Sequence, residues 1–421
     1  MKAILTPSVA SGSVRAIASK SMAHRLLICA AFADAPTTVI CTETNNDIEA
    51  TAACLSALGA NIKRTIDGYT VEPIDRERIP DSPLLDCGES GSTLRFMLPI
   101  VAALGKGGRF ALHGRLPERP LSPLREELEA HGITLSGKEL LTLSGRLNGD
   151  SFSIDGGVSS QFVSGLLFAL SLLEHPSKLQ ITGKLESAPY VDMTCNSLAL
   201  FGAAPIKTES GFEINAGGRL STPTHIAVEG DWSNAAFVLA LGVLSGEVEL
   251  LGLDQNSAQG DSKIVELLRE FGADITYIPE RRSYIAKKST LHSIRIDASQ
   301  IPDLVPILAT VASVAKGCTE IYGAARLRLK ESDRLESTAQ VLNALGASVR
   351  VSNDGLMIDG VESLRGGCVD SWGDHRIAMS AAVASTVAKS EVTIERAEAV
   401  QKSYPRFWDD MLSLKVKASI I

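Results

Sequence analysis

The stretch REFGADI (Arg269–Ile275) joins the end of a predicted helix to the start of a predicted strand. In the segment that leads into it, Ile264, Leu267, Leu268 and Phe271 have the spacing of one apolar helix face. A glycine that directly follows such a helix provides a left-handed C-terminal cap, and the residues after it begin a strand. The stretch therefore predicts a helix, a glycine cap and a strand in immediate succession.

The same junction recurs along the chain at a nearly constant interval. Its glycines are Gly59, Gly132, Gly202, Gly272 and Gly346, which lie 73, 70, 70 and 74 residues apart. A fixed period of this length is typical of a repeated supersecondary unit that packs against its neighbours.

A second series of segments lies between these junctions. Each segment starts with a short polar cluster and continues as an apolar run, and such runs are typical of helices buried on all sides. We take one residue near the start of each segment as its reference position, and successive reference positions are 71, 69, 72, 71 and 72 residues apart. These positions are Lys20, Gly91, Ser160, Trp232, Asp303 and His375.

Six units of about 71 residues therefore account for nearly the whole chain of 421 residues. We expect an α/β fold with two domains of three units each. Units one to three form a domain at residues 19–228, and units four to six form a second domain at residues 229–421. The sixth unit is short, so we expect the strand in residues 1–18 to complete it. The tract NAGGRLSTPTH (residues 215–225) is typical of a linker between the domains.

Composition excludes several classes of protein. The formal net charge of −8 argues against general binding to nucleic acid or to an anionic membrane. No apolar stretch is long enough for a membrane span, and the N-terminus lacks the pattern of a secretory signal. The seven cysteines form no C-x-x-C pair, which predicts reduced thiols, a cytoplasmic location and no structural zinc.

A cationic stretch lies in the fifth unit. RLRLKESDRLE (Arg326–Glu336) places three arginines and a lysine among three carboxylates. One interpretation is a solvated helix face. The other is an anion-binding cleft between the domains, because helix N-termini also attract anions. Lys330 and Arg334 would share one helical face and repel each other until an anion binds, so loss of Arg334 would not destabilise the free protein.

The chemistry expected in such a cleft is cationic binding of anions combined with proton transfer by carboxylates. A serine or glycine at a helix start is also explained by capping alone, and a single arginine is usually a surface residue, so only the repeated register favours a site. Asp303 lies in an apolar run at a helix start, and Glu331 lies within the cationic stretch, next to Lys330. We expect burial and neighbouring charges to separate their pKa values and give one base and one acid. No motif predicts a catalytic metal, a nucleotide-binding loop or a serine nucleophile.

Nine motifs carry a resemblance to a known family. In chain order they are SKSMAHR (19–25), GESGSTLRFM (88–97), LPERPL (116–121), SSQFVSGLL (159–167), ESAPYVDMT (186–194), IPDLVP (301–306), LKESDRL (329–335), GDHRIAM (373–379) and QKSYPRFW (401–408). In order and spacing they resemble the enolpyruvyl transferases over the whole chain. The resemblance implies a two-domain inside-out α/β barrel with six βαβαββ repeats, three per domain.

The resemblance also implies two substrate sites. For phosphoenolpyruvate, it implies Lys20, Gly91, Arg119, Gln161, Arg334, Arg376 and Lys402. For shikimate-3-phosphate, it implies Lys20, Ser21, Arg25, Ser159, Ser160, Gln161, Ser187, Tyr190, Asp303, Arg326 and Lys330. Arg326 stands where the family often has asparagine.

The implied reaction transfers the enolpyruvyl group of phosphoenolpyruvate to the 5-hydroxyl of shikimate-3-phosphate by addition and elimination. Asp303, with Lys330 beside it, is the expected base for the hydroxyl. Glu331 and Lys20 are the candidates for protonation of C3 and for assisting the departing phosphate. No cofactor and no metal are implied, and we expect a monomer that binds two small molecules and neither nucleic acid nor membrane.

Three alternatives remain open from the residues. Enolpyruvyl transfer to a UDP-sugar is the nearest, but the loop at LPERPL lacks the cysteine usual in that branch. An RNA-end-binding protein on a similar repeat fold is disfavoured by the negative charge and the few aromatic residues. A non-catalytic scaffold is disfavoured because the carboxylates and cations are all retained.

Overall fold

The computed structural model describes all 421 residues, which divide into two compact units. Unit 1 comprises Met1–Ile17 and Glu229–Ile421, and unit 2 comprises Ala18–Val228. The first boundary therefore falls one residue earlier than the sequence analysis placed it. Each unit has its own hydrophobic core.

Six helices form the inner layer of the two units, three in each. Their residues are almost all buried, because these segments are apolar on every side. In unit 2 they are α1 (Lys20–Ala31), α3 (Gly91–Leu104) and α5 (Ser160–Ser171); in unit 1 they are α7 (Trp232–Ser245), α9 (Val305–Ala312) and α11 (His375–Ala384). Five of the six reference positions are the first residue of a helix. The sixth, Asp303, lies in a short 3₁₀ turn just before α9.

Six further helices each bury only one face. In α8, Ile264, Leu267 and Leu268 are buried, as their spacing predicts, and Phe271 is buried at the helix end. The set is α2 (Asn46–Ala57), α4 (Leu124–Ala130), α6 (Ala188–Leu200), α8 (Ile264–Glu270), α10 (Arg334–Ala344) and α12 (Phe407–Ser413). Short 3₁₀ helices are η1 (Arg76–Arg78), η2 (Leu116–Glu118), η3 (Gly260–Lys263), η4 (Pro279–Arg281), η5 (Pro302–Leu304), η6 (Ala325–Leu329), η7 (Ser385–Val387) and η8 (Ala397–Lys402).

Unit 2 contains three four-stranded sheets. The first has the order β14-β3-β5-β4, with β14 (His225–Ala227), β3 (Thr37–Ile40), β5 (Gly68–Glu72) and β4 (Asn61–Arg64). The second has the order β6-β7-β9-β8, with β6 (Leu84–Asp86), β7 (Gly108–Ala111), β9 (Leu140–Gly145) and β8 (Ile133–Ser136). The third has the order β10-β11-β13-β12, with β10 (Ser151–Asp155), β11 (Ser177–Thr182), β13 (Gly211–Ile214) and β12 (Ile206–Thr208).

Unit 1 contains the other three sheets, again with four strands each. One has the order β16-β17-β15-β2, with β16 (Asp274–Ile278), β17 (Ser283–Lys287), β15 (Glu247–Leu251) and β2 (Ser11–Arg15). Another has the order β18-β19-β21-β20, with β18 (Arg295–Asp297), β19 (Cys318–Tyr322), β21 (Leu356–Asp359) and β20 (Ser348–Val351). The last has the order β22-β23-β1-β24, with β22 (Gly367–Asp370), β23 (Val392–Glu395), β1 (Lys2–Thr6) and β24 (Lys417–Ile420).

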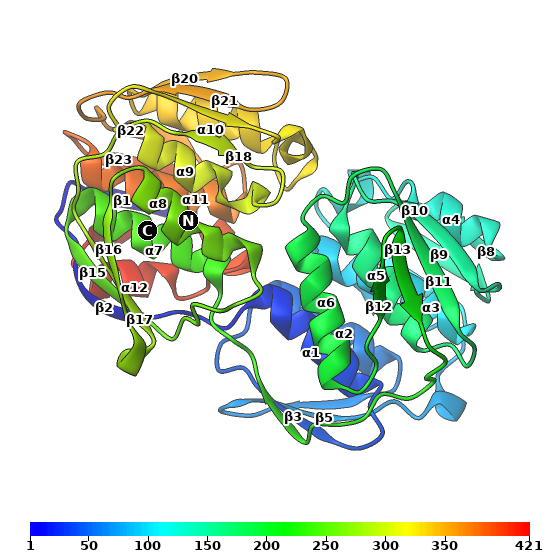
Figure 1. Cartoon of the computed structure of the whole chain (residues 1–421). Helices are drawn as coiled ribbons and strands as arrows, with labels where there is room; N and C mark the ends of the chain where they lie inside the picture. The colour runs from blue at the N-terminus through cyan, green and yellow to red at the C-terminus, as the bar shows by residue number, and fades with distance from the viewer. The chain divides into compact units, whose positions relative to one another are not determined.

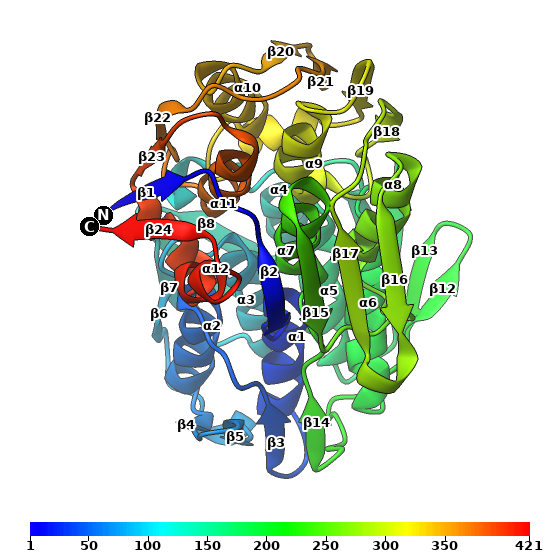
Figure 2. The same ribbon diagram turned by 90° about the vertical axis from the view of Figure 1, so that its left-hand side faces the viewer.

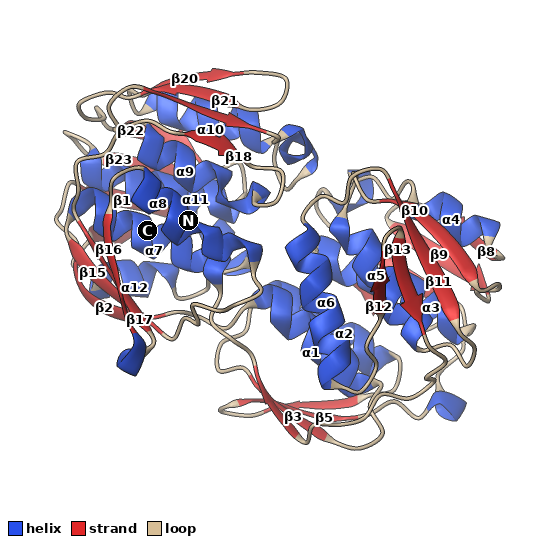
Figure 3. Ribbon diagram, in the orientation of Figure 1, coloured by secondary structure: helices blue, strands red, loops and turns tan.

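All six sheets share one topology. In each, a parallel pair at one edge is followed by two antiparallel pairs. Within each unit the sheets lie outside the inner helices (Figures 1 and 3). The predicted α/β fold of six repeats is therefore confirmed.

Three repeats are completed by strands that are distant in the sequence. β1 lies between β23 and β24, where Ile4 pairs with Thr393 and with Ser419, and both chain termini lie at this sheet (Figure 2). β2 pairs in parallel with β15, and β14 pairs in parallel with β3. The tract at residues 215–225 was expected to be a linker, but its last residue, His225, begins β14.

The five recurring glycines adopt the backbone conformation that the sequence predicts. Gly59, Gly132, Gly202, Gly272 and Gly346 have φ between +80° and +109°, where a side chain would be strained. The periodic glycines are therefore helix C-terminal caps. No helix of the chain combines the length and the apolar character needed to cross a membrane.

Candidate active site

Arg334 lies at the centre of a buried ionic network in unit 1. Its side chain is only 2% exposed, and it donates hydrogen bonds to three carboxylates. Nε bonds Asp374 Oδ2 at 2.8 Å, Nη1 bonds Asp303 Oδ1 at 2.8 Å, and Nη2 bonds Glu331 Oε2 at 2.6 Å. Three negative charges thus surround a single guanidinium, which makes the site a charged network rather than a patch of free cations.

The cationic stretch takes a different local shape from the one expected. Asp333 caps α10 by accepting a hydrogen bond from the backbone N–H of Glu336, so the helix begins only at Arg334. Lys330 precedes the helix, in a bend after η6, and its Nζ lies 3.8 Å from Asp303 Oδ1. The expectation that Lys330 and Arg334 share a helical face is therefore wrong.

Asp303 is the second centre of the network. Besides Arg334 and Lys330, Arg376 contacts it: Nη2 lies 3.1 Å from Oδ2, and Nη1 lies 3.3 Å from the backbone oxygen. Arg376 is the second residue of α11, so helix packing aims its side chain at η5. The sequence-predicted residues Asp303, Lys330, Glu331, Arg334 and Arg376 thus form one connected cluster.

The charges of this cluster shift the pKa values of its members. Burial alone would raise the pKa of Asp303, but Arg376, Lys330 and Arg334 hold it well below the ordinary range. Burial lowers the pKa of Lys330 to about 8, against the opposing influence of Asp303. Burial opposes the charge of Arg334, yet Asp374, Glu331 and Asp303 raise its pKa above the usual value. The network therefore contains an ionised carboxylate beside an amine whose pKa is near neutrality.

Two buried acids of this region were missed by the sequence analysis. Asp374 is fully buried, caps α11 by accepting from the N–H of Arg376 at 3.0 Å, and accepts from Ser332 Oγ at 3.1 Å. Its position directly before the His-Arg pair of GDHR was the available signal. Asp261 in η3 is 1% exposed and accepts a hydrogen bond from Ser233 Oγ; burial and the nearby Asp303 raise its pKa to about 6.

Two other predicted residues lie at the edge of this cluster. Lys402, the last residue of η8, donates from Nζ to the carbonyl oxygen of Gly373 at 3.1 Å, next to Asp374 in the chain. Arg326 in η6 donates from Nη2 to the carbonyl oxygen of Ser299 at 2.7 Å, and its charge contributes to the lowered pKa of Lys330.

In unit 2, several of the predicted residues lie at or near the starts of the inner helices. Lys20 is the first residue of α1, and its Nζ forms an ion pair with Asp47 Oδ2 at 3.0 Å. Arg25, one turn later, is 2% exposed; it donates to Thr194 Oγ1 at 2.8 Å and to the carbonyl oxygens of Ser21 and Tyr190 at 2.6 and 2.7 Å. Arg25 therefore joins α1 to α6, which carries Tyr190.

The start of α5 supplies hydroxyl and amide groups. Ser159 caps the helix by accepting from the N–H of Gln161 at 3.3 Å, and Ser160 follows as its first residue. The Gln161 amide donates from Nε2 to Ser92 Oγ at 2.8 Å and accepts at Oε1 from Arg95 Nη1 at 2.7 Å. Before α6, Ser187 is buried and has the positive φ of 54°.

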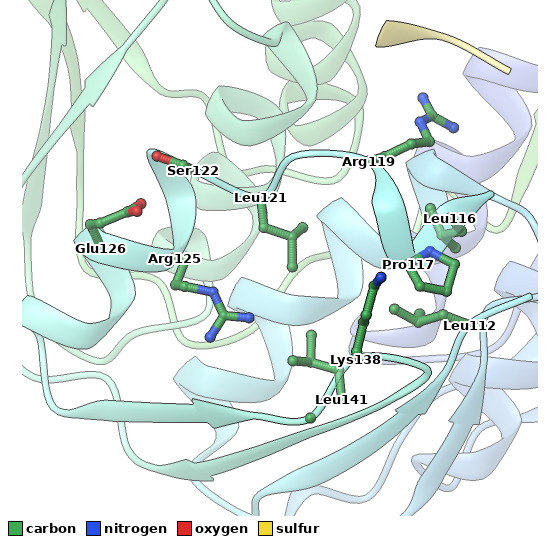
Figure 4. Close-up of a pocket in the computed structure, with 11 residues that line it drawn as sticks. Leu112, Leu116, Pro117, Arg119, Leu121, Ser122, Arg125, Glu126, Lys138 and Leu141 are labelled. Carbon is green, nitrogen blue, oxygen red and sulfur yellow. The ribbon is translucent and has the colours of Figure 1, made fainter. Parts of the chain in front are cut away.

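Arg119 lies directly against Gly91. A Cβ atom at Gly91 would lie 2.7 Å from Arg119 Nη1, so only glycine leaves the guanidinium in its place. Arg119 also lines a pocket of about 250 Å³, together with Leu112, Leu116 and Leu141. Figure 4 shows the Arg119 guanidinium pointing away from Leu141.

No group of three or more His, Cys, Asp or Glu side chains is placed to hold a metal ion. The candidate residues of unit 1 and those of unit 2 provide different chemical groups. The unit 1 set supplies a carboxylate, an amine and arginines in contact, which suits proton transfer beside an anion. The unit 2 set supplies helix N-termini, hydroxyls, one amide and cations, which suits anion binding.

Comparison with known proteins identifies the family. The family model described as EPSP synthase (3-phosphoshikimate 1-carboxyvinyltransferase) matches residues 5–411. A 3-phosphoshikimate 1-carboxyvinyltransferase of Clostridium perfringens (strain 13 / Type A) is 43% identical over 417 residues, which cover 98% of each chain. A protein of the same name from Clostridium kluyveri is 42% identical over 414 residues, 97% of this chain and 96% of that one.

A solved structure agrees with the sequence relatives. The EPSP synthase of Acinetobacter baumannii, solved at 2.37 Å, matches with a TM-score of 0.81 and 26% identity, and the match covers 100% of both chains. The match therefore extends over all six repeats. On these grounds the chain belongs to the EPSP synthase (3-phosphoshikimate 1-carboxyvinyltransferase) family.

Proposed function

We propose that this chain transfers the enolpyruvyl group of phosphoenolpyruvate to the 5-hydroxyl of shikimate-3-phosphate and releases phosphate, a step on the route to aromatic amino acids. The observation that carries this proposal is the match of the EPSP synthase family model to residues 5–411. The Asp303–Arg334–Glu331 contacts support it, because they place two carboxyl groups on one fixed cation.

In the addition step, Asp303 accepts the proton of the 5-hydroxyl while that oxygen bonds C2 of phosphoenolpyruvate. Three cations hold Asp303 in its ionised form, so it is ready to accept a proton at neutral pH. The negative charges of the substrates then offset these cations and raise its proton affinity. Lys330 Nζ lies 3.8 Å from Asp303 Oδ1, so it is placed to stabilise the substrate oxygen that gives its proton to Asp303.

Glu331 is the proposed donor of the proton that C3 gains as the oxygen adds to C2. In the elimination step the same carboxylate takes a proton back from C3, and the C2–O bond to phosphate breaks. Its contact with Arg334 at 2.6 Å holds the carboxylate in place while Arg334 is shared with Asp303 and Asp374. Lys20 is the proposed partner of the departing phosphate.

The remaining residues are proposed to bind the two substrates. Phosphoenolpyruvate is assigned to Lys20, Gly91, Arg119, Gln161, Arg334, Arg376 and Lys402. Shikimate-3-phosphate is assigned to Lys20, Ser21, Arg25, Ser159, Ser160, Gln161, Ser187, Tyr190, Asp303, Arg326 and Lys330. The helix N-termini at α1, α3 and α5 support this assignment, because their free N–H groups favour anions.

We further propose that the protein acts as a cytoplasmic monomer, without metal or cofactor and without binding nucleic acid. All seven cysteines are free, and four of them are buried, as is usual for proteins of a reducing compartment. Charge stabilisation is assigned to arginine and lysine side chains, so EDTA should leave the rate unchanged.

A direct test measures phosphate release from phosphoenolpyruvate with either shikimate-3-phosphate or a UDP-sugar as the acceptor. We expect release only with shikimate-3-phosphate, at the same rate with and without EDTA. Release with the UDP-sugar alone would contradict the assigned acceptor. Loss of activity in EDTA, restored by one divalent ion, would contradict the assignment of charge stabilisation.

A further inference from the structure

Arg95 is a buried arginine of α3 that the substrate assignments above do not use. It is 6% exposed, and its guanidinium carbon lies 5.3 Å from the centre of the Phe162 ring in α5. Nη1 donates to Gln161 Oε1 at 2.7 Å, and Nη2 lies 3.3 Å from the carbonyl oxygen of Pro120. One side chain thus joins the start of α5 to the segment that carries Arg119.

The close approach of α3 and α5 makes these contacts possible. A Cβ atom at Gly165 would lie only 2.2 Å from the backbone oxygen of Arg95, so the two helices touch where α5 has no side chain. Gln161 lies one turn before Gly165 in α5, on the same side of the helix. Packing of the helices therefore places the Gln161 amide within reach of Arg95.

Arg95 decides which end of the Gln161 amide faces which partner. A guanidinium has only donors, so the atom that faces it must be the amide oxygen. The NH₂ group is then directed to Ser92 Oγ, at 2.8 Å, beside Gly91 at the start of α3. In this orientation the amide presents donors to an anion at that helix start; in the reversed orientation it would present its oxygen, which repels an anion.

The hydrogen bond from Arg95 to the Pro120 carbonyl oxygen lies next to Arg119, another residue assigned to phosphoenolpyruvate. Pro120 directly follows Arg119, whose guanidinium lies against Gly91. A bond to the Pro120 carbonyl restrains the backbone next to Arg119. Both contacts of Arg95 therefore lead to groups assigned to phosphoenolpyruvate.

We propose that Arg95 is a positioning residue for phosphoenolpyruvate: it orients the Gln161 amide with its NH₂ group toward the anion and restrains the backbone beside Arg119. Arg95 acts through these two groups and is not itself a ligand. This proposal rests on the proposed function, because it assumes that Gln161 and Arg119 bind phosphoenolpyruvate.

The test compares Arg95→Lys with a matched variant of unit 2, Arg76→Lys. Arg76 also donates to a carbonyl oxygen, that of Leu172 at 3.1 Å, and also lies over a phenylalanine ring, that of Phe32 at 5.9 Å. Lysine keeps the positive charge but cannot bond Gln161 and Pro120 through two arms of a planar group. We expect Arg95→Lys to raise KM for phosphoenolpyruvate about tenfold, with kcat within about threefold of wild type. Arg76→Lys should leave both constants unchanged.

A double-mutant cycle separates positioning from general damage. In a Gln161→Ala background, Arg95→Lys should raise KM by a much smaller factor than it does in wild type, because one of its two targets is gone. If Arg95→Lys raises KM by the same factor in the Gln161→Ala background as in wild type, the proposal is wrong. So would an Arg95→Lys enzyme that is folded, by its unfolding midpoint, and has the KM of Arg76→Lys.

The proposed function is tested separately, by phosphate release from the wild-type protein. Wild-type protein that releases no phosphate from phosphoenolpyruvate and shikimate-3-phosphate would contradict the function itself. Wild-type protein that is active, with Arg95→Lys unchanged in KM, would contradict only the role of Arg95.

Discussion

The two units solve the problem of holding charged side chains in different ways. In unit 1, Arg334 contacts three carboxylates and is nearly inaccessible, so positive charge is balanced by the protein itself. In unit 2, Lys20 Nζ pairs with Asp47 at 3.0 Å, and the buried Arg25 donates to a hydroxyl and to backbone carbonyls. The buried Arg25 of unit 2 is therefore held by neutral acceptors, whereas the buried Arg334 of unit 1 is held by acids.

The difference indicates a division of labour. A network of balanced charges fixes acids and bases at set protonation states, which proton transfer requires. Cations supported mainly by dipoles keep more of their charge for a bound anion. We therefore assign proton transfer to the cluster of unit 1 and most of the anion binding to the helix starts of unit 2.

The largest expected effect comes from removing the central cation of unit 1. Arg334→Met leaves Asp374, Asp303 and Glu331 without their shared partner, so the free energy of unfolding should fall by about 3–5 kcal/mol. This replaces the expectation that loss of Arg334 spares the free protein, which assumed that Lys330 and Arg334 repel each other on one helical face until an anion binds. Urea denaturation followed by circular dichroism measures the change.

The matched variant for this comparison is Arg119→Met in unit 2. It should raise KM for phosphoenolpyruvate strongly, yet change the free energy of unfolding by less than about 1 kcal/mol, because Arg119 is only partly buried whereas Arg334 is 2% exposed. Equal destabilisation by the two variants would contradict the division of labour.

A second effect concerns stability in acid. The pKa of Asp303 is lowered in the folded protein, so its ionised form contributes stability above the pKa of the unfolded chain, and this is lost as pH falls. Between pH 5 and 3, the wild type should therefore lose stability more steeply than Asp303→Asn, by up to about 1.4 kcal/mol per pH unit. Urea titrations at each pH give the free energy of unfolding. If it falls equally with pH in both proteins, Asp303 does not stabilise the fold through its ionised form.

A third effect concerns Lys330, whose pKa is about 8 in the ligand-free protein. Only its charged form attracts the anionic acceptor, and that form is lost as pH rises through 8. KM for shikimate-3-phosphate should therefore rise about tenfold from pH 7 to pH 9. Lys330→Arg stays charged, and its KM should be nearly flat over the same range. A wild-type KM that does not change between these pH values would exclude Lys330 as a titrating contact.

The smallest effect is expected at Gly91. A methyl group there would displace the flexible end of Arg119, since its Cβ would lie 2.7 Å from Nη1. Gly91→Ala should raise KM for phosphoenolpyruvate by about fivefold and leave the unfolding midpoint unchanged. In an Arg119→Met background the same substitution should have no further effect on KM. A fivefold rise in KM in the Arg119→Met background would show that Gly91→Ala does not act through Arg119.

The repeat architecture could be predicted from the sequence because its signals are local. A glycine cap such as Gly272 and an apolar run such as α7 each depend on a few neighbouring residues. The completion of repeats by β2 and β14 could not be predicted in this way, because each pairs with a strand that is far away in the sequence.

The site shows the same division between local and distant information. Motifs were enough to name Arg334 and Asp303, but the contacts of Arg334 with Asp303 and Asp374 span 31 and 40 residues. One local signal was missed: Asp333 and Glu336 have the spacing of a helix start, which places Lys330 outside α10. The position of Lys330 could therefore have been predicted, whereas the pairing of Arg334 with Asp303 and Asp374 could not.

The central claim is tested most directly by the steady-state kcat and KM for phosphoenolpyruvate of two variants, Glu331→Gln in unit 1 and Gln161→Ala in unit 2. We predict that Glu331→Gln lowers kcat by at least about 100-fold with little change in KM, because it removes a proton donor. Gln161→Ala should raise KM about tenfold, with kcat within about threefold of wild type. The reverse pattern, with KM changed by Glu331→Gln and kcat changed by Gln161→Ala, would contradict the account.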